Sequence, residues 1–244
     1  MVVTTQICDK TIQFEGKYPE LKTFFKDYLV ENTEPDYILT WTDEEILAEQ
    51  ELVPNENFPL SYLETLTALR KVSEIFPQHN RLLIHGASIS YKDKAYLFCA
   101  PSGTGKSTHI RLWKEYLGND VEIVNGDKPF VSLDNDVPII YGTPWAGKEN
   151  WHRNCSYPLD GVCFLKRGTQ NAIRKLTPAE CLPLLMKQVY LPKNTISAGN
   201  TLELVDKLIN RVPFYLLECD ISEQAVKCSF EALTGLSYAQ KQNK

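Results

Sequence analysis

The N-terminal part of the chain mixes two periods of apolar residues, one of two residues and one of helical spacing. Alternating runs predict strands over 4–8, 11–14 and 37–41. Helical spacing predicts a helix over 19–29, and a capping box of Thr42 and Glu45 opens a second, acidic helix. Because the Pro-containing segment 53–57 has the composition of a linker, we expect a small α/β unit over residues 1–57.

The rest of the chain, residues 58–244, is expected to form one larger domain. Apolar residues at helical spacing from Leu60 to Phe76 predict a helix that Pro77 ends. A continuous strand over 82–91 is predicted to form a hairpin with 95–99. Further strands are predicted over 121–124, 130–133, 137–141, 161–165, 172–176 and 214–219, with 161–165 and 172–176 as a pair. Helices are predicted from the start signal at 177–180, over 202–209 and over 222–233.

Residues 100–107, Ala-Pro-Ser-Gly-Thr-Gly-Lys-Ser, have the pattern of a phosphate-binding loop, with Ala100 where Gly is usual. A predicted strand precedes the loop and a predicted helix follows it, as the motif requires. Backbone amides of such a loop surround phosphate oxygens at the N-terminus of the helix. We expect Lys106 to reach the terminal phosphates and the Ser107 hydroxyl to bind Mg²⁺. A nucleoside triphosphate or similar polyphosphate would be held by Ser102, Gly103, Thr104, Gly105, Lys106, Ser107 and Thr108.

Asp127 is the carboxylate that we expect beside this loop. It follows the apolar strand 121–124, at the place where phosphate-loop enzymes usually carry a carboxylate at the end of an adjacent strand. Its two candidate roles are magnesium ligation, directly or through water, and general base toward an acceptor hydroxyl. The alternative is an ordinary turn, because Asn-Gly-Asp at 125–127 also favours turns.

Two further places carry candidate chemistry. His85 lies in the predicted hairpin, either as a hydrogen-bonded core residue or as a donor to charge at the terminal phosphate. The segment 142–153 is expected to be an exposed loop. In it, Trp145 could stack on a base or an acceptor, and Lys148 or Arg153 could steady the charge of transferred phosphate. The alternative is a structured connection whose tryptophans pack on the body.

Composition narrows the class of protein. The 244 residues carry a net charge of −5 and no basic run, which argues against nucleic acid or an anionic membrane as partner. No apolar stretch approaches the ~20 residues that span a bilayer, and the N-terminus lacks the features of a signal peptide. The seven cysteines form no Cys-x-x-Cys pair, and scattered cysteines suit a reducing compartment. We expect a soluble, cytoplasmic protein.

Three features in order resemble the HPr kinase/phosphorylase and phosphoenolpyruvate carboxykinase superfamily: a His-Gly in a hairpin, the phosphate loop, and a strand ending in Gly-Asp. The resemblance covers roughly residues 81–153. It implies an α/β (α+β) fold with a mixed sheet, in which a kinase core of this type follows a small N-terminal α/β extension. It also implies site roles: a phosphate contact for His85, the loop lysine for Lys106, the magnesium-binding hydroxyl for Ser107, and the first of two adjacent acidic residues for Asp127.

The chain departs from that pattern at the second acidic position, where it has Lys128. This departure argues against a two-carboxylate mechanism and against phosphorylase activity. The frequent assembly of the superfamily's members leaves a homo-oligomer open.

The leading hypothesis is a Mg²⁺-dependent kinase that transfers the terminal phosphoryl group of ATP to a serine-like hydroxyl in a small molecule, peptide or protein. Asp127 would accept the hydroxyl proton, while Lys106, His85 and magnesium stabilise the transferred group. The alternative is a nucleotide-binding regulatory or accessory module with little turnover. The identity of the acceptor, and ATP against GTP or pyrophosphate as donor, stay open.

Overall fold

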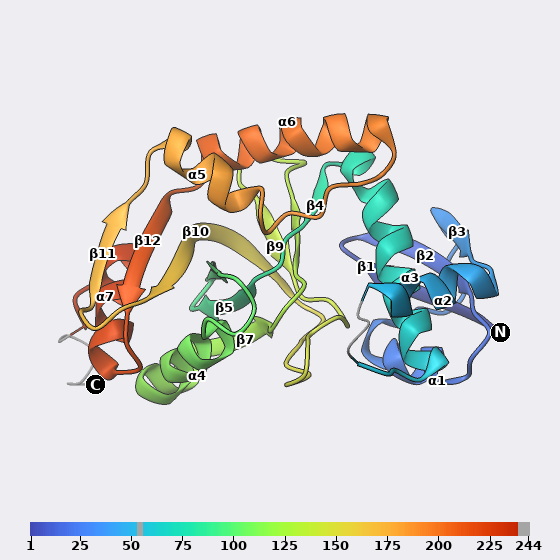
Figure 1. Ribbon diagram of the computed structural model, residues 1–244, viewed down its shortest axis with the longest axis horizontal. Helices are drawn as coiled ribbons and strands as arrows, with labels where there is room; N and C mark the ends of the chain where they lie inside the picture. The colour runs from blue at the N-terminus through green and yellow to red at the C-terminus, as the bar shows by residue number, and fades with distance from the viewer. Residues whose placement is uncertain (53–55, 239–244) are drawn as a thin grey trace. The chain divides into compact units, whose positions relative to one another are not determined.

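The computed structural model describes residues 1–52 and 56–238 and divides the chain into two compact units, Met1–Phe76 and Pro77–Lys244 (Figure 1). The division falls later than the boundary after residue 57 that the sequence suggests. Helix α3 (Leu60–Ile75) explains the difference, because it packs against the helices of the first unit. Within the expected linker 53–57, residues 53–55 lie outside the described residues.

The first unit is a three-stranded sheet with helices packed on it. The sheet has the order β1 (Val2–Ile7), β2 (Lys10–Glu15), β3 (Tyr37–Thr40), with β1 antiparallel and β3 parallel to β2. The hairpin turn is at Cys8 and Asp9, so Cys8 lies outside the strand predicted over 4–8, and both residues have positive φ, 53° and 60°. The helices are α1 (Glu20–Phe24), a 3-10 turn at Lys26–Tyr28, α2 (Asp43–Glu51) and α3.

The predicted capping box is confirmed: the Thr42 side chain accepts from Glu45 N, and the Glu45 side chain accepts from Thr42 N.

A buried carboxylate, that of Glu64, connects three segments of the first unit. Glu64 on α3 accepts hydrogen bonds from Lys17 N at 2.6 Å, Tyr18 N at 3.1 Å and Trp41 Nε1 at 2.9 Å. Because all these donors satisfy it, Glu64 can be buried without the usual cost of an unpaired charge.

The second unit is built on a nine-stranded mixed sheet, as the α/β expectation requires. Its main path is β4-β8-β9-β10-β6-β5-β7, and β12 followed by β11 extends from β10. The strands are β4 (Arg81–Leu83), β5 (Ala87–Tyr91), β6 (Lys94–Cys99), β7 (Val121–Asn125), β8 (Phe130–Ser132), β9 (Ile139–Tyr141), β10 (Ser156–Arg167), β11 (Ala172–Lys175) and β12 (Phe214–Cys219).

Strand β10 is long enough to join two parts of this sheet. Its first residues pair antiparallel with β9, and its remaining residues pair in parallel with both β6 and β12. Parallel strands end at the same edge of a sheet. The loop after β6, Arg167 at the end of β10 and Cys219 at the end of β12 therefore lie at one edge.

Two expectations about the sheet are wrong. Residues 82–91 form two strands, because the chain leaves β4 and crosses at His85 and Gly86 to a different part of the sheet. A Cβ at Gly86 would lie 2.7 Å from Leu97 Cδ1, so this crossing requires glycine. The segments 161–165 and 172–176 do not pair with each other, because β12 lies between β10 and β11.

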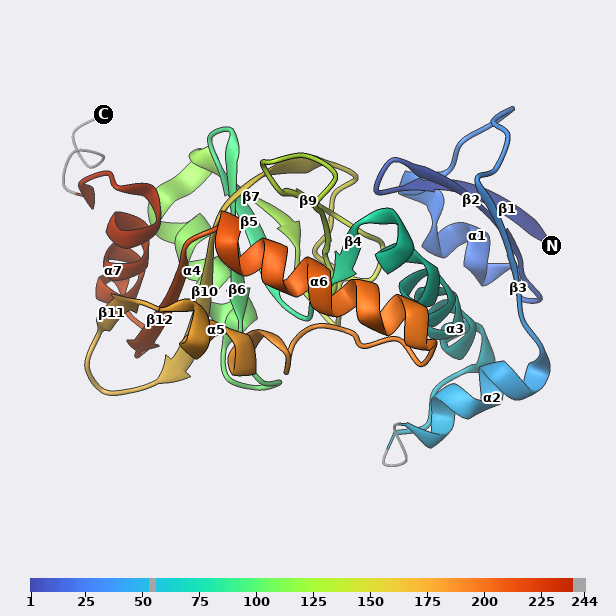
Figure 2. The ribbon, with the colours of Figure 1, turned by 90° about the horizontal axis from the view of Figure 1, so that it is seen from above.

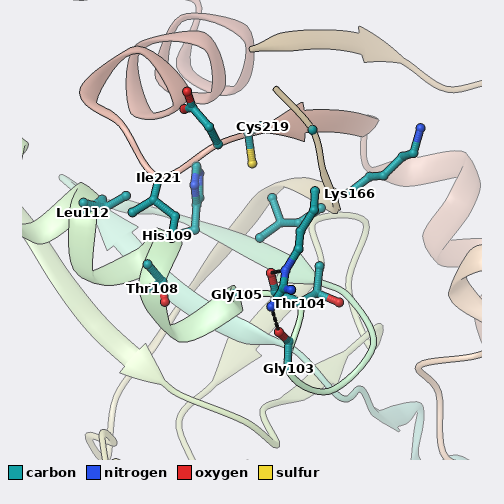
Figure 3. Close-up of a pocket in the computed structure, with 13 residues that line it drawn as sticks. Gly103, Thr104, Gly105, Thr108, His109, Leu112, Lys166, Cys219 and Ile221 are labelled. Carbon is teal, nitrogen blue, oxygen red and sulfur yellow. Dashed lines mark hydrogen bonds between the residues drawn. The ribbon is translucent and has the colours of Figure 1, made fainter. Parts of the chain in front are cut away.

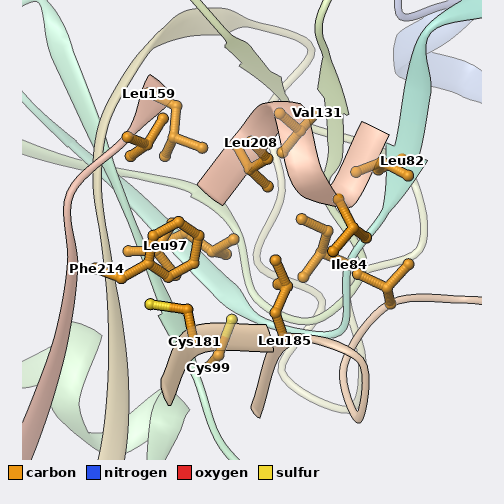
Figure 4. Close-up of a cluster of buried hydrophobic side chains, with 14 of the residues drawn as sticks. Leu82, Ile84, Leu97, Cys99, Val131, Leu159, Cys181, Leu185, Leu208 and Phe214 are labelled. Carbon is orange, nitrogen blue, oxygen red and sulfur yellow. The ribbon is translucent and has the colours of Figure 1, made fainter. Parts of the chain in front are cut away.

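The alternating side chains of β6 and β10 fill one core on each face of the sheet. Leu97 and Phe164 contribute to the core under α5 (Pro178–Leu185) and α6 (Thr195–Arg211). Helix α6 lies over the strands in Figure 2. Figure 4 shows buried residues of this core. Phe98 and Leu165 contribute to the other core, under α4 (Lys106–Leu117) and α7 (Glu223–Thr234). The second unit is thus a three-layer arrangement with the phosphate loop at one strand edge.

Within residues 1–52 and 56–238, no helix combines the length and the apolar composition that crossing a bilayer requires.

Candidate functional site

The phosphate loop connects β6 directly to α4, as the motif requires. Gly103 and Gly105 have φ of +74° and +123°, and nothing lies within 4 Å of where a Cβ would stand at either residue. Such conformations strongly favour glycine. The open space at both glycines leaves room for a ligand to approach the backbone closely. A loop of this shape can hold a polyphosphate by its amides at the start of α4.

Lys106 is the first residue of α4, and only 7% of its surface is exposed. Its Nζ donates to the carbonyl oxygen of Ala100 at 2.9 Å. Burial lowers the pKa of the Lys106 ammonium, whereas the charges of Asp127 and Glu149 act in the opposite direction. The charge of Asp127 therefore acts on the loop lysine.

Asp127 is held by two basic side chains. His85 Nε2 lies 3.2 Å from its Oδ1, and Lys128 Nζ lies 2.8 Å from its Oδ2. Burial alone would raise the pKa of Asp127, but the hydrogen bond from His85 and the charge and hydrogen bond of Lys128 outweigh it and lower the pKa to about 2. The carboxylate is therefore ionised throughout the neutral range.

The position of Asp127 differs in one respect from the sequence expectation. Strand β7 is not the neighbour of β6, because β5 lies between them. Asp127 stands in the turn after β7, where the Asn125 side-chain oxygen accepts from Asp127 N at 2.8 Å and from Lys128 N at 2.7 Å. The backbone carbonyl of Asp127 accepts from Gly86 N at 2.9 Å. The turn chemistry of Asn125 thus holds Asp127 beside Gly86, just after the end of β7.

The segment 142–153 is packed onto this turn instead of forming a fully exposed loop. Asn125 Nδ2 donates to Thr143 O at 2.9 Å, and Gly126 N donates to Trp151 O at 2.8 Å. Gly147 has φ +75°, and its Cβ position is 3.1 Å from Asp127 Cβ. The segment therefore forms one wall of the Asp127 site.

Its candidate substrate residues are not brought together. Trp145 is only 4% exposed, so its ring is part of the packing and is not a stacking platform for a base or acceptor. The guanidinium of Arg153 is paired with Glu122 on β7, with Nη1 2.9 Å from Oε1. Lys148 is exposed. Among the charged residues of this segment, Glu149 is the one whose charge acts on Lys106.

A cavity of about 460 Å³ opens beside the phosphate loop (Figure 3). Its walls are the loop, α4 and the ends of β10 and β12, and apolar side chains of Leu112, Leu165 and Ile221 line it. His109 also faces it, but burial lowers the pKa of His109 to about 3. The imidazole is neutral and bonded within the core, to Ser229 Oγ at 3.0 Å and Trp113 Nε1 at 3.2 Å.

Arg167 is a residue at this site that the sequence analysis missed. Its Nε donates to Thr104 O at 3.1 Å, and its Nη2 donates to Gly103 O. No motif contains it, and its role depends on the parallel pairing of β10 with β6. The one sequence signal was a basic pair, Lys166 and Arg167, at the end of an apolar strand.

Ser107 and Asp127 provide a hydroxyl and a carboxylate near the loop, and hard oxygen ligands of this kind suit Mg²⁺. Within the described part of the chain, no group of three or more His, Cys, Asp or Glu side chains could hold a metal ion by itself. Mg²⁺ is usually held by one or two carboxylates together with substrate phosphates and water, so this donor set fits it.

No protein-family model matches the chain, and no curated protein matches it. Among solved structures, the Hpr(Ser) kinase/phosphatase from Coxiella burnetii is similar, with a TM-score of 0.36 and 11% sequence identity. The match covers 66% of this chain and 99% of that protein's chain.

Proposed function

We propose that the chain is a magnesium-dependent kinase that transfers the terminal phosphoryl group of a nucleoside triphosphate to a hydroxyl group. The acceptor hydroxyl is serine-like, in a small molecule, a peptide or a protein. One observation carries the proposal: the loop lysine, Lys106, lies in electrostatic reach of an ionised carboxylate, Asp127, that is bonded to His85. Phosphoryl transfer depends on such positioning and charge stabilisation more than on covalent chemistry by the protein.

The donor would occupy the loop and the adjoining cavity. The phosphate tail lies against the loop amides, with Lys106 near the terminal phosphates. The cavity of about 460 Å³, with Leu112, Leu165 and Ile221 on its walls, offers apolar surface that pyrophosphate would not use. A nucleoside fits this surface, since ligand sites are mostly apolar with a few polar groups. This supports ATP or a similar nucleotide as donor.

Asp127 would orient the acceptor hydroxyl. With a pKa of about 2, it is a weak base toward a free hydroxyl, so it receives the proton only as the new bond to phosphorus forms. The hydrogen bond from His85 and the ion pair with Lys128 hold the carboxylate ionised, and Lys128 adds positive charge near the transferred group. Ser107 and Asp127 would hold Mg²⁺, which supplies further neutralisation of phosphate charge when bound.

The second candidate is a nucleotide-binding module with little turnover. It is favoured by the same carboxylate, because both oxygens of Asp127 are engaged and its low pKa weakens it as a base. Such a module would keep the donor site and lack an effective acceptor site.

One experiment separates the two candidates. The protein is incubated with γ-labelled ATP and Mg²⁺ together with pools of hydroxyl-bearing small molecules and peptides, and products are detected by label and by the mass of one phosphate. We expect transfer that Asp127→Asn reduces by about 10²–10⁴-fold, the range of general acid–base effects. Asp160→Asn is the matched control, because Asp160 pairs with Lys94 at 3.0 Å on the surface. Tight ATP binding without transfer to any acceptor would favour the module.

A further inference from the structure

Arg167 bridges two strand ends of the site. It is the last residue of β10, and its guanidinium donates to the carbonyl oxygens of Gly103 and Thr104 in the phosphate loop. These two loop residues are labelled in Figure 3. These two bonds are charge-assisted, and such hydrogen bonds are roughly twice as strong as neutral ones. Arg167 also lines the cavity beside the loop and a second pocket that includes residues 101–104.

The two carbonyls belong to peptide groups that carry loop amides. A trans peptide is planar, so its C=O and its N–H point in opposite directions. Fixing the carbonyls of Gly103 and Thr104 on Arg167 therefore fixes the N–H groups of Thr104 and Gly105. Thr104 N donates to Pro101 O at 3.2 Å and closes a turn within the loop, whereas Gly105 N–H points away from Arg167.

Packing does little to hold this part of the loop. At Gly103 and Gly105 nothing lies within 4 Å of a Cβ position, and Ser102 is exposed. Glycine is the residue that loses most conformational freedom on folding. A loop with two such residues depends on polar contacts for its conformation, and the fork of Arg167 supplies two of them.

The end of β10 is itself fixed to β12, so the bonds from Arg167 attach the loop to a rigid part of the sheet. Gly168 N donates to Cys219 O at 2.9 Å, and Lys166 Nζ pairs with Glu218 Oε2 at 2.7 Å. The Glu218 side chain lies directly against Gly168, with its Cγ 2.2 Å from where a Cβ would stand.

We propose that Arg167 is a positioning residue that sets the peptide groups of the phosphate loop for a polyphosphate, without contacting the phosphate itself. This assignment rests on the proposed function in one respect, the binding of a polyphosphate by the loop. It goes beyond that function because it names a residue outside the motif on which donor affinity depends.

The test uses Arg167→Ala and Arg167→Lys in the full chain. Affinities for ATP, ADP and tripolyphosphate are measured by calorimetry, and backbone ¹⁵N order parameters of Thr104 and Gly105 are measured without ligand. We expect Arg167→Ala to weaken all three ligands by about tenfold and to lower both order parameters, since two charge-assisted bonds are lost. Arg167→Lys should behave like the alanine variant, because an ammonium cannot reproduce the planar fork.

Lys94→Ala is the matched control: it removes one exposed positive charge at the opposite end of β6 from the loop and leaves the loop bonds intact. It should change the affinities less than twofold. Unchanged order parameters in Arg167→Ala, or full rescue of ATP affinity by lysine, would overturn the assignment, since charge alone would then account for the effect. If the wild type binds ATP without transferring phosphate, the kinase proposal fails and the assignment of Arg167 stands. If it binds none of the three ligands, both fail.

Discussion

His85 Nε2 lies 3.2 Å from Asp127 Oδ1, although the two residues are separated in sequence by the whole phosphate loop and its helix. The antiparallel pairing of β5 with β7, with Ser88 opposite Asn125, explains the contact. Residues that precede β5 must then lie beside residues that follow β7. The pairing of β5 with β7 thus places the imidazole of His85 beside the carboxylate of Asp127.

Replacing His85 by Ala should expose its role in tuning this carboxylate. The hydrogen bond from His85 is the largest of the influences that lower the pKa of Asp127. Its loss should raise that pKa above about 2, and phosphoryl transfer should fall by about 10–10³-fold because a donor to developing charge is lost. Carboxyl ¹³C titration checks the first effect and steady-state kinetics the second. An unchanged titration would show that the contact has no electrostatic effect.

Gly147→Ala should disturb the Asp127 site through the wall that packs on it. Gly147 has φ +75°, and an added Cβ would lie 3.1 Å from Asp127 Cβ. Strain of this kind costs about 1–3 kcal/mol. We expect a lower midpoint of urea unfolding together with reduced turnover. Gly199→Ala on α6 is the control, because nothing lies within 4 Å of its Cβ position, and alanine there should stabilise the helix by about 0.5–1 kcal/mol.

Trp145→Ala should act on stability and not on substrate choice. The side chain is 4% exposed, and truncation of a buried aromatic side chain typically costs about 3–5 kcal/mol. Arg153→Ala removes an exposed ion pair with Glu122 and should change stability by less than about 1 kcal/mol. Urea unfolding measures both. If Trp145→Ala had normal stability and an altered acceptor preference, Trp145 would contact the substrate, contrary to what its burial indicates.

His109 should make stability depend on pH. Burial lowers its pKa from 6.5 to about 3 in the folded protein, so between these values the unfolded chain binds the additional proton. Stability is full above pH 6.5 and falls on acidification, by about 2 kcal/mol between pH 6.5 and pH 5. His109→Gln should lack this part of the pH dependence. Parallel pH profiles of unfolding for the variant and the wild type would contradict the prediction.

Local features of the site can be predicted from the sequence. The phosphate loop, the hairpin of β5 with β6 and the capping box at Thr42 depend on residues close together in the chain. Their chemistry is set by spacing and by side-chain type, which a single sequence displays.

Long-range pairings could not be predicted in the same way. The insertion of β12 between β10 and β11 joins segments far apart in the chain. The bond of Arg167 to Thr104 likewise depends on the long-range parallel pairing of β10 with β6. The burial of Trp145 depends on Asn125 binding the segment that carries it. Glycines and polar residues suggested an exposed loop there, but tertiary hydrogen bonds reversed this.

The most direct test of the account is a crystal structure with Mg²⁺ and a non-hydrolysable ATP analogue. We expect the phosphate tail to lie on the amides of residues 102–107, with the carboxylate of Asp127 facing the terminal phosphate and the nucleoside in the cavity beside Ile221. A loop without phosphate at saturating analogue, or an Asp127 side chain directed away from the phosphate tail, would contradict it.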